Sequence, residues 1–319
     1  MTPFPASPRV SVVIPLFQKG PYIGRALESV FRQTLEDFEV IVINDGSTDE
    51  ALRILSEMVD PRLVVHSKAN EGVSAARNKG VSLARAPWVA FLDADDEWLP
   101  TFLESTVAIA GTHEGIAASF SNLLNHQTGR QLLRQVASQE FVVRDYFAAL
   151  LANDGIGMSS SSVLISKARI LSIGGFDERV RQGEDIDLWA RLAWSGDVAY
   201  CGNALAICHT EVPHSASKSV REAIAPYPAV LRSYEEWSRS KRIPDLLRDS
   251  SRRYANWILA RHVMELAHHG FREVAKSRLR GASWRSNAEP SLWKAALWLK
   301  LPTPVLRAGR RIRSTLPFR

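Results

Sequence analysis

Apolar strand patterns alternate with helical patterns through the first hundred residues, and this alternation constrains the fold more than any other feature of the chain. The predicted strands are residues 10–15, 38–43, 63–66 and 88–92, and the predicted helices between them are residues 22–33, 50–58 and 73–84. Strands that alternate with helices pair in parallel, and the helices then cover both faces of the sheet. We therefore predict an α/β fold whose ligand site lies at the carboxyl ends of the strands.

Composition fits a globular protein with one large domain over residues 1–225 and a smaller helical region over residues 226–319. The chain has 319 residues, of which 45% are hydrophobic and 23% charged. Its two cysteines, Cys201 and Cys208, are too few for a disulfide framework or a cysteine zinc site, and they fit a reducing compartment. Residues 1–8 lack the apolar segment of a secretory signal, and no stretch approaches the roughly 20 apolar residues of a membrane span. These features predict a cytoplasmic protein.

Charge is distributed unevenly along the chain. Residues 1–225 hold 20 Lys and Arg against 27 Asp and Glu, whereas residues 226–319 hold 20 against 7. A basic tail of this kind binds nucleic acid, an anionic membrane surface or an acidic partner, or it is simply a solvated helix surface. Trp293 and Trp298 lie beside Lys294 and Lys300, a pattern typical of a helix at an anionic lipid surface. The same residues could instead pack on the main domain.

Within the tail, residues 254–269 and 271–282 have apolar residues at helical spacing. Gly270 lies between the two segments. They predict a helical hairpin that turns at Gly270.

An acidic tetrad follows the fourth predicted strand. Asp93-Ala94-Asp95-Asp96 comes directly after the apolar residues 88–92. Two carboxylates one residue apart at a strand end cannot both enter a core without a large desolvation cost. We expect them to face a cleft and a divalent cation that substrate phosphates also bind. The alternative is a solvated acidic turn.

Four segments are predicted to meet at this edge of the sheet. They are Pro15-Leu16-Phe17, Asn44-Asp45-Gly46-Ser47, Asn70-Glu71-Gly72 before the helix that carries Arg77, and Asp93-Ala94-Asp95. A carboxylate such as Asp45 can accept from a base N–H, an aromatic ring such as Phe17 can stack, and Arg77 can pair with phosphate. Taken singly, Asp45 could be a turn residue and Arg77 a helix-surface charge.

Five ordered motifs carry a resemblance to a known family. They read Val-Ser-Val-Val-Ile-Pro at 10–15, Asn-Asp-Gly-Ser-Thr-Asp at 44–49, Asn-Glu-Gly-Val-Ser-Ala-Ala-Arg-Asn at 70–78, Phe-Leu-Asp-Ala-Asp-Asp at 91–96 and Gly-Glu-Asp-Ile-Asp-Leu-Trp at 183–189. Together they resemble the family 2 (GT2) inverting glycosyltransferases of the GT-A fold, a Rossmann-like mixed sheet with helices on both faces. Gln18 and Ala86-Pro87 depart from the family pattern.

The resemblance implies a nucleotide-sugar half over about residues 1–100 and an acceptor half over about residues 101–225. It implies that Pro15, Phe17 and Asp45 contact the uridine of a UDP-sugar, and that Asn70, Gly72 and Ala94 help to form the donor site. It places Arg77 and Asp93 on the donor's ribose and phosphates, and Asp95 with Asp93 on Mg²⁺ or Mn²⁺. His209 or His214 falls where some relatives supply a third metal ligand, although a lone histidine is more often structural.

The acids at 184–187 are the candidates for catalysis. An inverting transfer needs one carboxylate to take the proton of the acceptor hydroxyl. We assign Asp185 as this base, at the start of a predicted helix, with Glu184 orienting a neighbour or contacting the acceptor. The alternative is that Glu184, Asp185 and Asp187 only complement the helix dipole. Residues 153–162, which end in four serines, are predicted as a flexible loop near the acceptor.

These expectations amount to a metal-dependent transferase that extends a lipid-linked or surface glycan, cytoplasmic or peripheral on the inner face of the plasma membrane. Nucleic acid is not expected as a partner. A sugar nucleotidyltransferase would need a glycine-rich basic loop after the first strand, which residues 15–21 lack. A dehydrogenase would need Gly-x-Gly-x-x-Gly there. The alternative from another class is a nucleotide-sugar sensor or scaffold that does not use its catalytic acids.

Overall fold

The computed structural model describes residues 7–112, 114–132, 141–155, 157–210, 227–281 and 290–300. The chain forms two compact units, Met1–Ala216 and Ser217–Arg319. The predicted boundary between residues 225 and 226 stays a prediction, because residues 211–226 are outside the described part of the chain. His214 lies in the same stretch, so its assignment as a metal ligand also falls outside the described residues.

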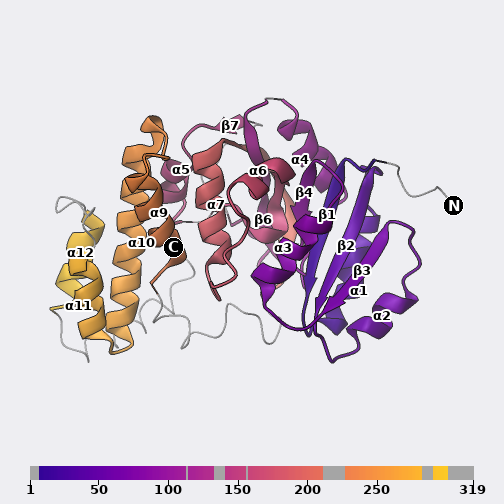
Figure 1. Cartoon of the computed structure of the whole chain (residues 1–319), viewed down its shortest axis with the longest axis horizontal. Coiled ribbons are helices and arrows are strands. Elements are labelled where there is room, and N and C mark those ends of the chain that lie inside the picture. The colour runs from indigo at the N-terminus through magenta and orange to yellow at the C-terminus, as the bar shows by residue number, and fades with distance from the viewer. Residues whose placement is uncertain are drawn as a thin grey trace. The chain divides into compact units, whose positions relative to one another are not determined.

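The first unit is built on a mixed sheet, as predicted. In the described ranges its strands are β1 (Val10–Leu16), β2 (Phe38–Asp45), β3 (Leu63–Lys68), β4 (Trp88–Phe91), β5 (Glu97–Trp98), β6 (Ile116–Asn125), β7 (Phe141–Val143), β8 (Val163–Ser166) and β9 (Asp197–Cys208). The strand order is β3-β2-β1-β4-β8-β6-β9-β5, and β7 also pairs with β9. Strands β3, β2, β1 and β4 are parallel, whereas β8 runs antiparallel to both β4 and β6 (Figure 1).

The helices of the first unit follow the predicted alternation. They are α1 (Gly20–Phe31), α2 (Ala51–Glu57), α3 (Val73–Leu83), α4 (Phe102–Ala110), α5 (Tyr146–Ala152), α6 (Lys167–Ser172) and α7 (Glu184–Ser195), with the short 3-10 helix η1 (Ser160–Ser162). The predicted ranges of the first three helices agree with the structure to within about two residues.

Helices cover both faces of β1, which explains why all of its residues except Ser11 are apolar, without alternation. Val12 and Ile14 pack in one core with Leu27 of α1. Val13 points to the opposite face, where α3 packs so closely that a Cβ on Gly80 would lie 2.2 Å from the Val13 side chain. Successive strand residues therefore enter two separate layers, and the sheet edge is left to hold the polar segments.

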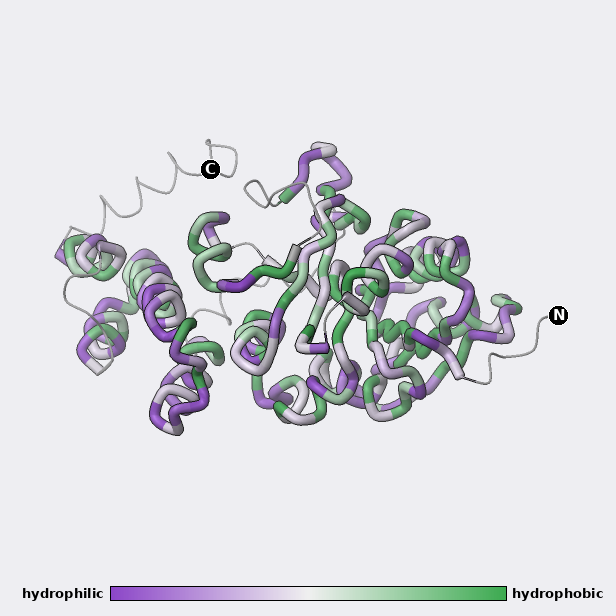
Figure 2. Tube along the Cα trace, turned by 90° about the horizontal axis from the view of Figure 1, so that it is seen from above, coloured by the Kyte–Doolittle hydropathy of each residue, from purple (hydrophilic) through white to green (hydrophobic). Residues whose placement is uncertain are grey.

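The second unit is helical. It contains α9 (Ala229–Arg239), the 3-10 helix η3 (Asp245–Leu247), α10 (Arg248–His268), α11 (Arg272–Gly281) and α12 (Pro290–Trp298). The predicted hairpin is present as α10 and α11, with Gly270 at φ +91° in the turn. Hydrophilic and hydrophobic residues alternate along these helices (Figure 2). Over the described residues, no helix has the length and apolar character needed to cross a membrane.

Candidate active site

The parallel pairing brings the predicted polar segments to one edge of the sheet. Leu16 at the end of β1 pairs with Asn44 near the end of β2, and Val13 pairs with Phe91 at the end of β4. The segments that follow these three strands therefore emerge side by side, as the sequence predicts. Phe17 is 47% exposed there, so about half of its surface is open to a partner, while Pro15 is half-buried within β1.

Asp45 holds the loop that leads into α3. Its buried carboxylate accepts hydrogen bonds from the backbone N–H of Glu71 (3.0 Å) and of Gly72 (2.8 Å), and Lys68 Nζ lies 2.8 Å away. Gly72 adopts φ +97°, a conformation that favours glycine, as the residue before the helix. Asp45 therefore stabilises the turn before α3. Its contact with a nucleotide base stays a prediction. Asn70, in the same loop, is exposed.

Arg77 links two motifs that are far apart in the sequence. Its side chain is 4% exposed; Nη1 donates to Glu184 Oε1 at 2.9 Å and Nη2 donates to Asp93 Oδ1 at 2.8 Å. The guanidinium also lies over the ring of Phe176, 5.3 Å from its centroid. The alternative of a helix-surface charge is therefore wrong. Arg77 holds Asp93, which follows β4, next to Glu184 in the first turn of α7.

The acids of the tetrad have different surroundings. Asp93 is the most open, with a side chain 36% exposed, and Ala94 is buried. Asp95 forms an ion pair with Lys19 Nζ at 2.6 Å, and its backbone oxygen accepts from Arg25 Nη2 at 2.6 Å. The contacts of Asp95 with Lys19 and Arg25 are not those of a solvated acidic turn, the alternative interpretation of the tetrad.

Asp96 is the buried member of the tetrad. It accepts from Ser161 Oγ at 2.5 Å and from the backbone N–H of His209 at 3.0 Å. Burial, and then the charge of Asp93, raise the pKa of Asp96 to about 7. Ser161 belongs to η1. The end of the predicted flexible loop, Ser160–Ser162, is therefore a buried helical turn that supports the tetrad.

His209 takes part in a buried network. Its Nε2 lies 2.8 Å from Glu97 Oε1, and its ring lies against that of His126 with centroids 4.1 Å apart. In the described ranges, no three His, Cys, Asp or Glu side chains are grouped so as to hold a metal ion. Of the predicted metal ligands, Asp93 and Asp95 provide two carboxylates in the described part of the chain. The assignment of His209 as a third ligand stays a prediction.

Glu184, Asp185 and Asp187 occupy the first turn of α7, which begins after Gly183 at φ +76°. Glu184 pairs with Arg77, and Asp187 pairs with Arg191 at 2.8 Å. The carboxylate of Asp185 accepts from the backbone N–H of Ile186 at 2.8 Å and, among described residues, forms no ion pair. Burial raises the pKa of Asp185, and burial followed by the charge of Asp185 raises the pKa of Glu184. A carboxylate with a raised pKa is a stronger base.

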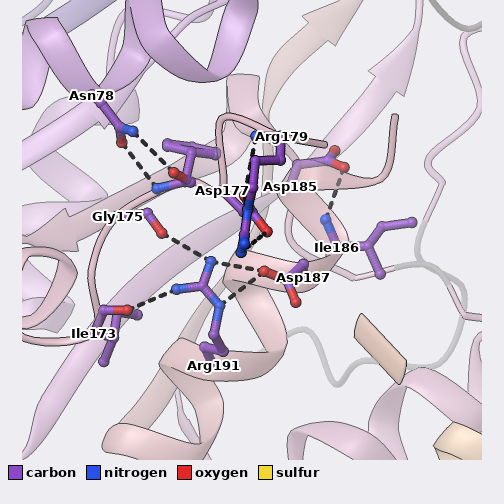
Figure 3. A network of polar contacts seen from close by, with 10 residues as sticks. Asn78, Ile173, Gly175, Asp177, Arg179, Asp185, Ile186, Asp187 and Arg191 are labelled. Carbon is purple, nitrogen blue, oxygen red and sulfur yellow. Dashed lines mark hydrogen bonds and ion pairs between the residues drawn. The ribbon is translucent and has the colours of Figure 1, made fainter. Parts of the chain in front are cut away.

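The loop before α7 is held from two sides (Figure 3). Arg191 Nη1 donates to Ile173 O at 2.9 Å and its Nη2 donates to Gly175 O at 2.8 Å. From α3, Asn78 Nδ2 donates to Phe176 O, and Asn78 Oδ1 accepts from Phe176 N–H, both at 2.9 Å. These contacts fix the start of α7, and with it the position of Asp185.

Three residues of the site, Lys19, Arg25 and Ser161, were not identified from the sequence. Lys19 lies just after the first strand, at the predicted polar edge, so a cation there could have been inferred from the sequence. No sequence signal identifies the partner of Ser161, because the contact with Asp96 spans 65 residues and depends on the position of β8.

Comparison with known proteins finds a family match within the first unit. Residues 11–144 match the family model described as glycosyl transferase family 2. A 218-residue stretch is 27% identical to the hyaluronan synthase of Pasteurella multocida, over 67% of this chain and 21% of that protein. This chain spans about a fifth to a half of the length of several curated relatives.

Two solved structures share the fold. Residues 1–349 of TarS from S. aureus, in complex with UDP-GlcNAc, align with a TM-score of 0.74 at 18% identity, covering 98% of this chain and 93% of that one. The mannosyltransferase PcManGT from Pyrobaculum calidifontis, in complex with GDP-Man and Mn²⁺, aligns with a TM-score of 0.59 at 16% identity, covering 98% and 86%. At such identities the likeness establishes the fold.

Proposed function

We propose that the chain is a member of glycosyltransferase family 2 and that it transfers a sugar, with inversion, from a UDP-sugar to a glycan or lipid-linked acceptor. The observation that carries this proposal is the bridge made by Arg77. Its contact with Glu184 spans 107 residues, and the same guanidinium binds Asp93, so that Asp93 lies near the first turn of α7, which carries Asp185. A donor-site acid pair and an acceptor-side base in one cluster are what such a transfer requires.

Each acid then has a separate role in the reaction. Asp185, free of an ion pair among the described residues and with a raised pKa, would take the proton of the acceptor hydroxyl. Glu184 would hold Arg77 in place, and the guanidinium would offset negative charge on the diphosphate. Phe17 and Asp45 would contact the base, with Pro15, Asn70, Gly72 and Ala94 shaping the donor site.

A divalent cation fits the residues at the strand end. Asp95 already pairs with a cationic group, and Asp93 keeps one oxygen away from Arg77 on a partly exposed side chain. Hard carboxylate oxygens suit Mg²⁺ and Mn²⁺, and these ions fill the rest of their coordination shell with phosphate oxygens and water. When bound, the cation would supply charge stabilisation for the departing diphosphate. The complex of PcManGT with GDP-Man and Mn²⁺ supports this assignment.

The same comparisons support the proposed donor and biological setting. The complex of TarS with UDP-GlcNAc supports a UDP-sugar, and the similarity to a hyaluronan synthase supports a role in polysaccharide synthesis. The acceptor would then be a growing or lipid-linked glycan on the cytoplasmic face of the membrane.

A panel of UDP-, GDP-, dTDP- and CMP-sugars, each with Mn²⁺ or with chelator, tests the donor site by melting temperature. We expect one UDP-sugar to stabilise the protein by about 2.7 kcal/mol at 100 times its Kd, because a ligand that binds only the folded state shifts the unfolding equilibrium. Chelator or Asp95→Ala should remove most of the shift. No shift with any nucleotide would contradict the proposal and favour a scaffold.

We also propose that the second unit docks on anionic lipid. Trp293 and Leu297 of α12 are 71% and 61% exposed, and Phe271 beside α11 is 44% exposed. Residues 226–319 hold 20 Lys and Arg against 7 Asp and Glu. Exposed apolar residues on a strongly basic unit are typical of a peripheral membrane surface.

Sedimentation with vesicles that contain phosphatidylglycerol tests this surface. The variant Trp293→Ala/Leu297→Ala should bind about tenfold more weakly or worse, because each side chain loses 1 to 3 kcal/mol of burial in lipid. Leu246→Ala, which removes a 76% exposed residue from η3, is the matched control. Equal binding by both variants would argue against a role for α12.

A further inference from the structure

Lys19 forms an ion pair with Asp95, the carboxylate that is proposed to bind the divalent cation. Its Nζ lies 2.6 Å from Asp95 Oδ2, and both side chains are 16% exposed. Lys19 directly precedes α1, and Arg25 of that helix donates to the backbone oxygen of Asp95. The centroid of the Tyr22 ring lies 5.8 Å from Nζ, within the range of a cation–π contact. Lys19 and Arg25 therefore both attach the first half of α1 to Asp95.

This contact differs from the surface ion pairs of the protein. Arg53 and Glu57, for example, form a pair one helical turn apart with both side chains 63% exposed. Lys19 and Asp95 are 76 residues apart and mostly screened from water. An ammonium is a compact point charge with three donors, so it is a better substitute for a small cation than a guanidinium would be.

An ammonium and a divalent cation compete for Asp95. At a separation of about 4 Å, two like charges near a protein surface repel each other by several times the thermal energy. Binding of a cation to Asp95 therefore requires that Lys19 move away. A diphosphate at the same edge of the sheet offers the displaced ammonium a new anionic partner.

We propose that Lys19 is the counter-ion of Asp95 in the donor-free protein, and that it makes divalent-cation binding depend on the nucleotide diphosphate. This inference rests on the proposed function, since it takes Asp95 as a cation ligand. In the donor-free state Lys19 weakens cation binding. The diphosphate attracts Lys19 away from Asp95, so the cation and the nucleotide bind cooperatively. Because coupling is reciprocal, the cation tightens nucleotide binding by the same factor.

The test is the affinity of the whole protein for Mn²⁺, measured by electron paramagnetic resonance of free Mn²⁺ with and without UDP. Wild-type protein should bind Mn²⁺ about tenfold more tightly, or more, when UDP is present. Lys19→Gln should bind Mn²⁺ about five- to tenfold more tightly than wild type without UDP, and its gain from UDP should shrink. Lys19→Arg, which keeps the charge, should retain most of the wild-type coupling.

Lys79→Gln is the matched control, because Lys79 is an exposed residue of α3 and its loss changes the net charge equally. An unchanged Mn²⁺ affinity in Lys19→Gln, or an equal gain in Lys79→Gln, would overturn the role of Lys19. Asp95→Asn separates this failure from that of the proposed function. If Asp95→Asn loses Mn²⁺ binding in the presence of UDP while Lys19→Gln behaves as wild type, the cation site stands and only the exchange is wrong. If wild-type protein binds no Mn²⁺ with or without UDP, both are wrong.

Discussion

Asp185→Asn is expected to slow sugar transfer by about 10²- to 10⁴-fold, the range that a positioned general base contributes. The amide keeps the size of the side chain, and it can still accept from the backbone N–H of Ile186, which lies 2.8 Å from Asp185 Oδ1. Donor binding should therefore persist. The measurement is the rate of UDP release from the stabilising donor, together with the melting-temperature shift of the same variant.

Asp197→Asn is the control for this substitution. Asp197 is exposed at the start of β9, and the change in charge and size is the same. The control should release UDP at the wild-type rate. If Asp185→Asn also turns over at the wild-type rate, Asp185 is not the base, and Glu184 becomes the candidate.

The pH dependence of the rate checks the same assignment. Burial raises the pKa of Asp185, and a general base works only when it is deprotonated. As the pH falls, kcat/KM should therefore begin to decline at a higher pH than an ordinary aspartate would give. Glu184 lies next to Asp185 and its pKa is also raised, so the decline belongs to the pair. A rate that stays flat down to the usual aspartate range would contradict the assignment.

The sheet was predictable because β1, β2 and β4 are largely apolar on both faces. Val12 and Val13 enter different layers, so the strand needs no polar alternation, and a continuous apolar run between helical patterns has few other interpretations. The polar edge was predictable for a related reason. Turn residues and acids follow each strand, and parallel pairing brings those strand ends together.

The contacts within the site were not predictable in the same way. Arg77 reaches Glu184 over 107 residues, and Lys19 reaches Asp95 over 76. Such contacts depend on which strands are neighbours and on how far each helix extends, and neither is encoded in a local pattern. The serines of η1 illustrate the limit, because serine-rich sequence usually indicates a loop, whereas Ser161 here satisfies a buried acid. Tertiary context decides such cases.

Arg77→Met is expected to destabilise the first unit by about 3 to 5 kcal/mol, the cost of removing one partner from a buried ion pair. The guanidinium is 4% exposed, and its loss would leave Asp93 and Glu184 without their shared partner beside Asp185. Methionine keeps the apolar length of the side chain against Phe176, so the effect is mainly one of charge. Urea denaturation of wild type and variant measures the free energy of unfolding.

Two further variants identify the cause of that loss. Arg53→Met removes an exposed helix pair with Glu57 and should cost about 0.5 kcal/mol or less. Arg77→Met/Glu184→Gln should be less destabilised than the sum of its single variants, because the second change removes one of the carboxylates that the first leaves unpaired. Additive losses would mean that Arg77 stabilises the fold through packing alone. In that case the ion pairs of Arg77 with Asp93 and Glu184 would not be what holds Asp185 in position.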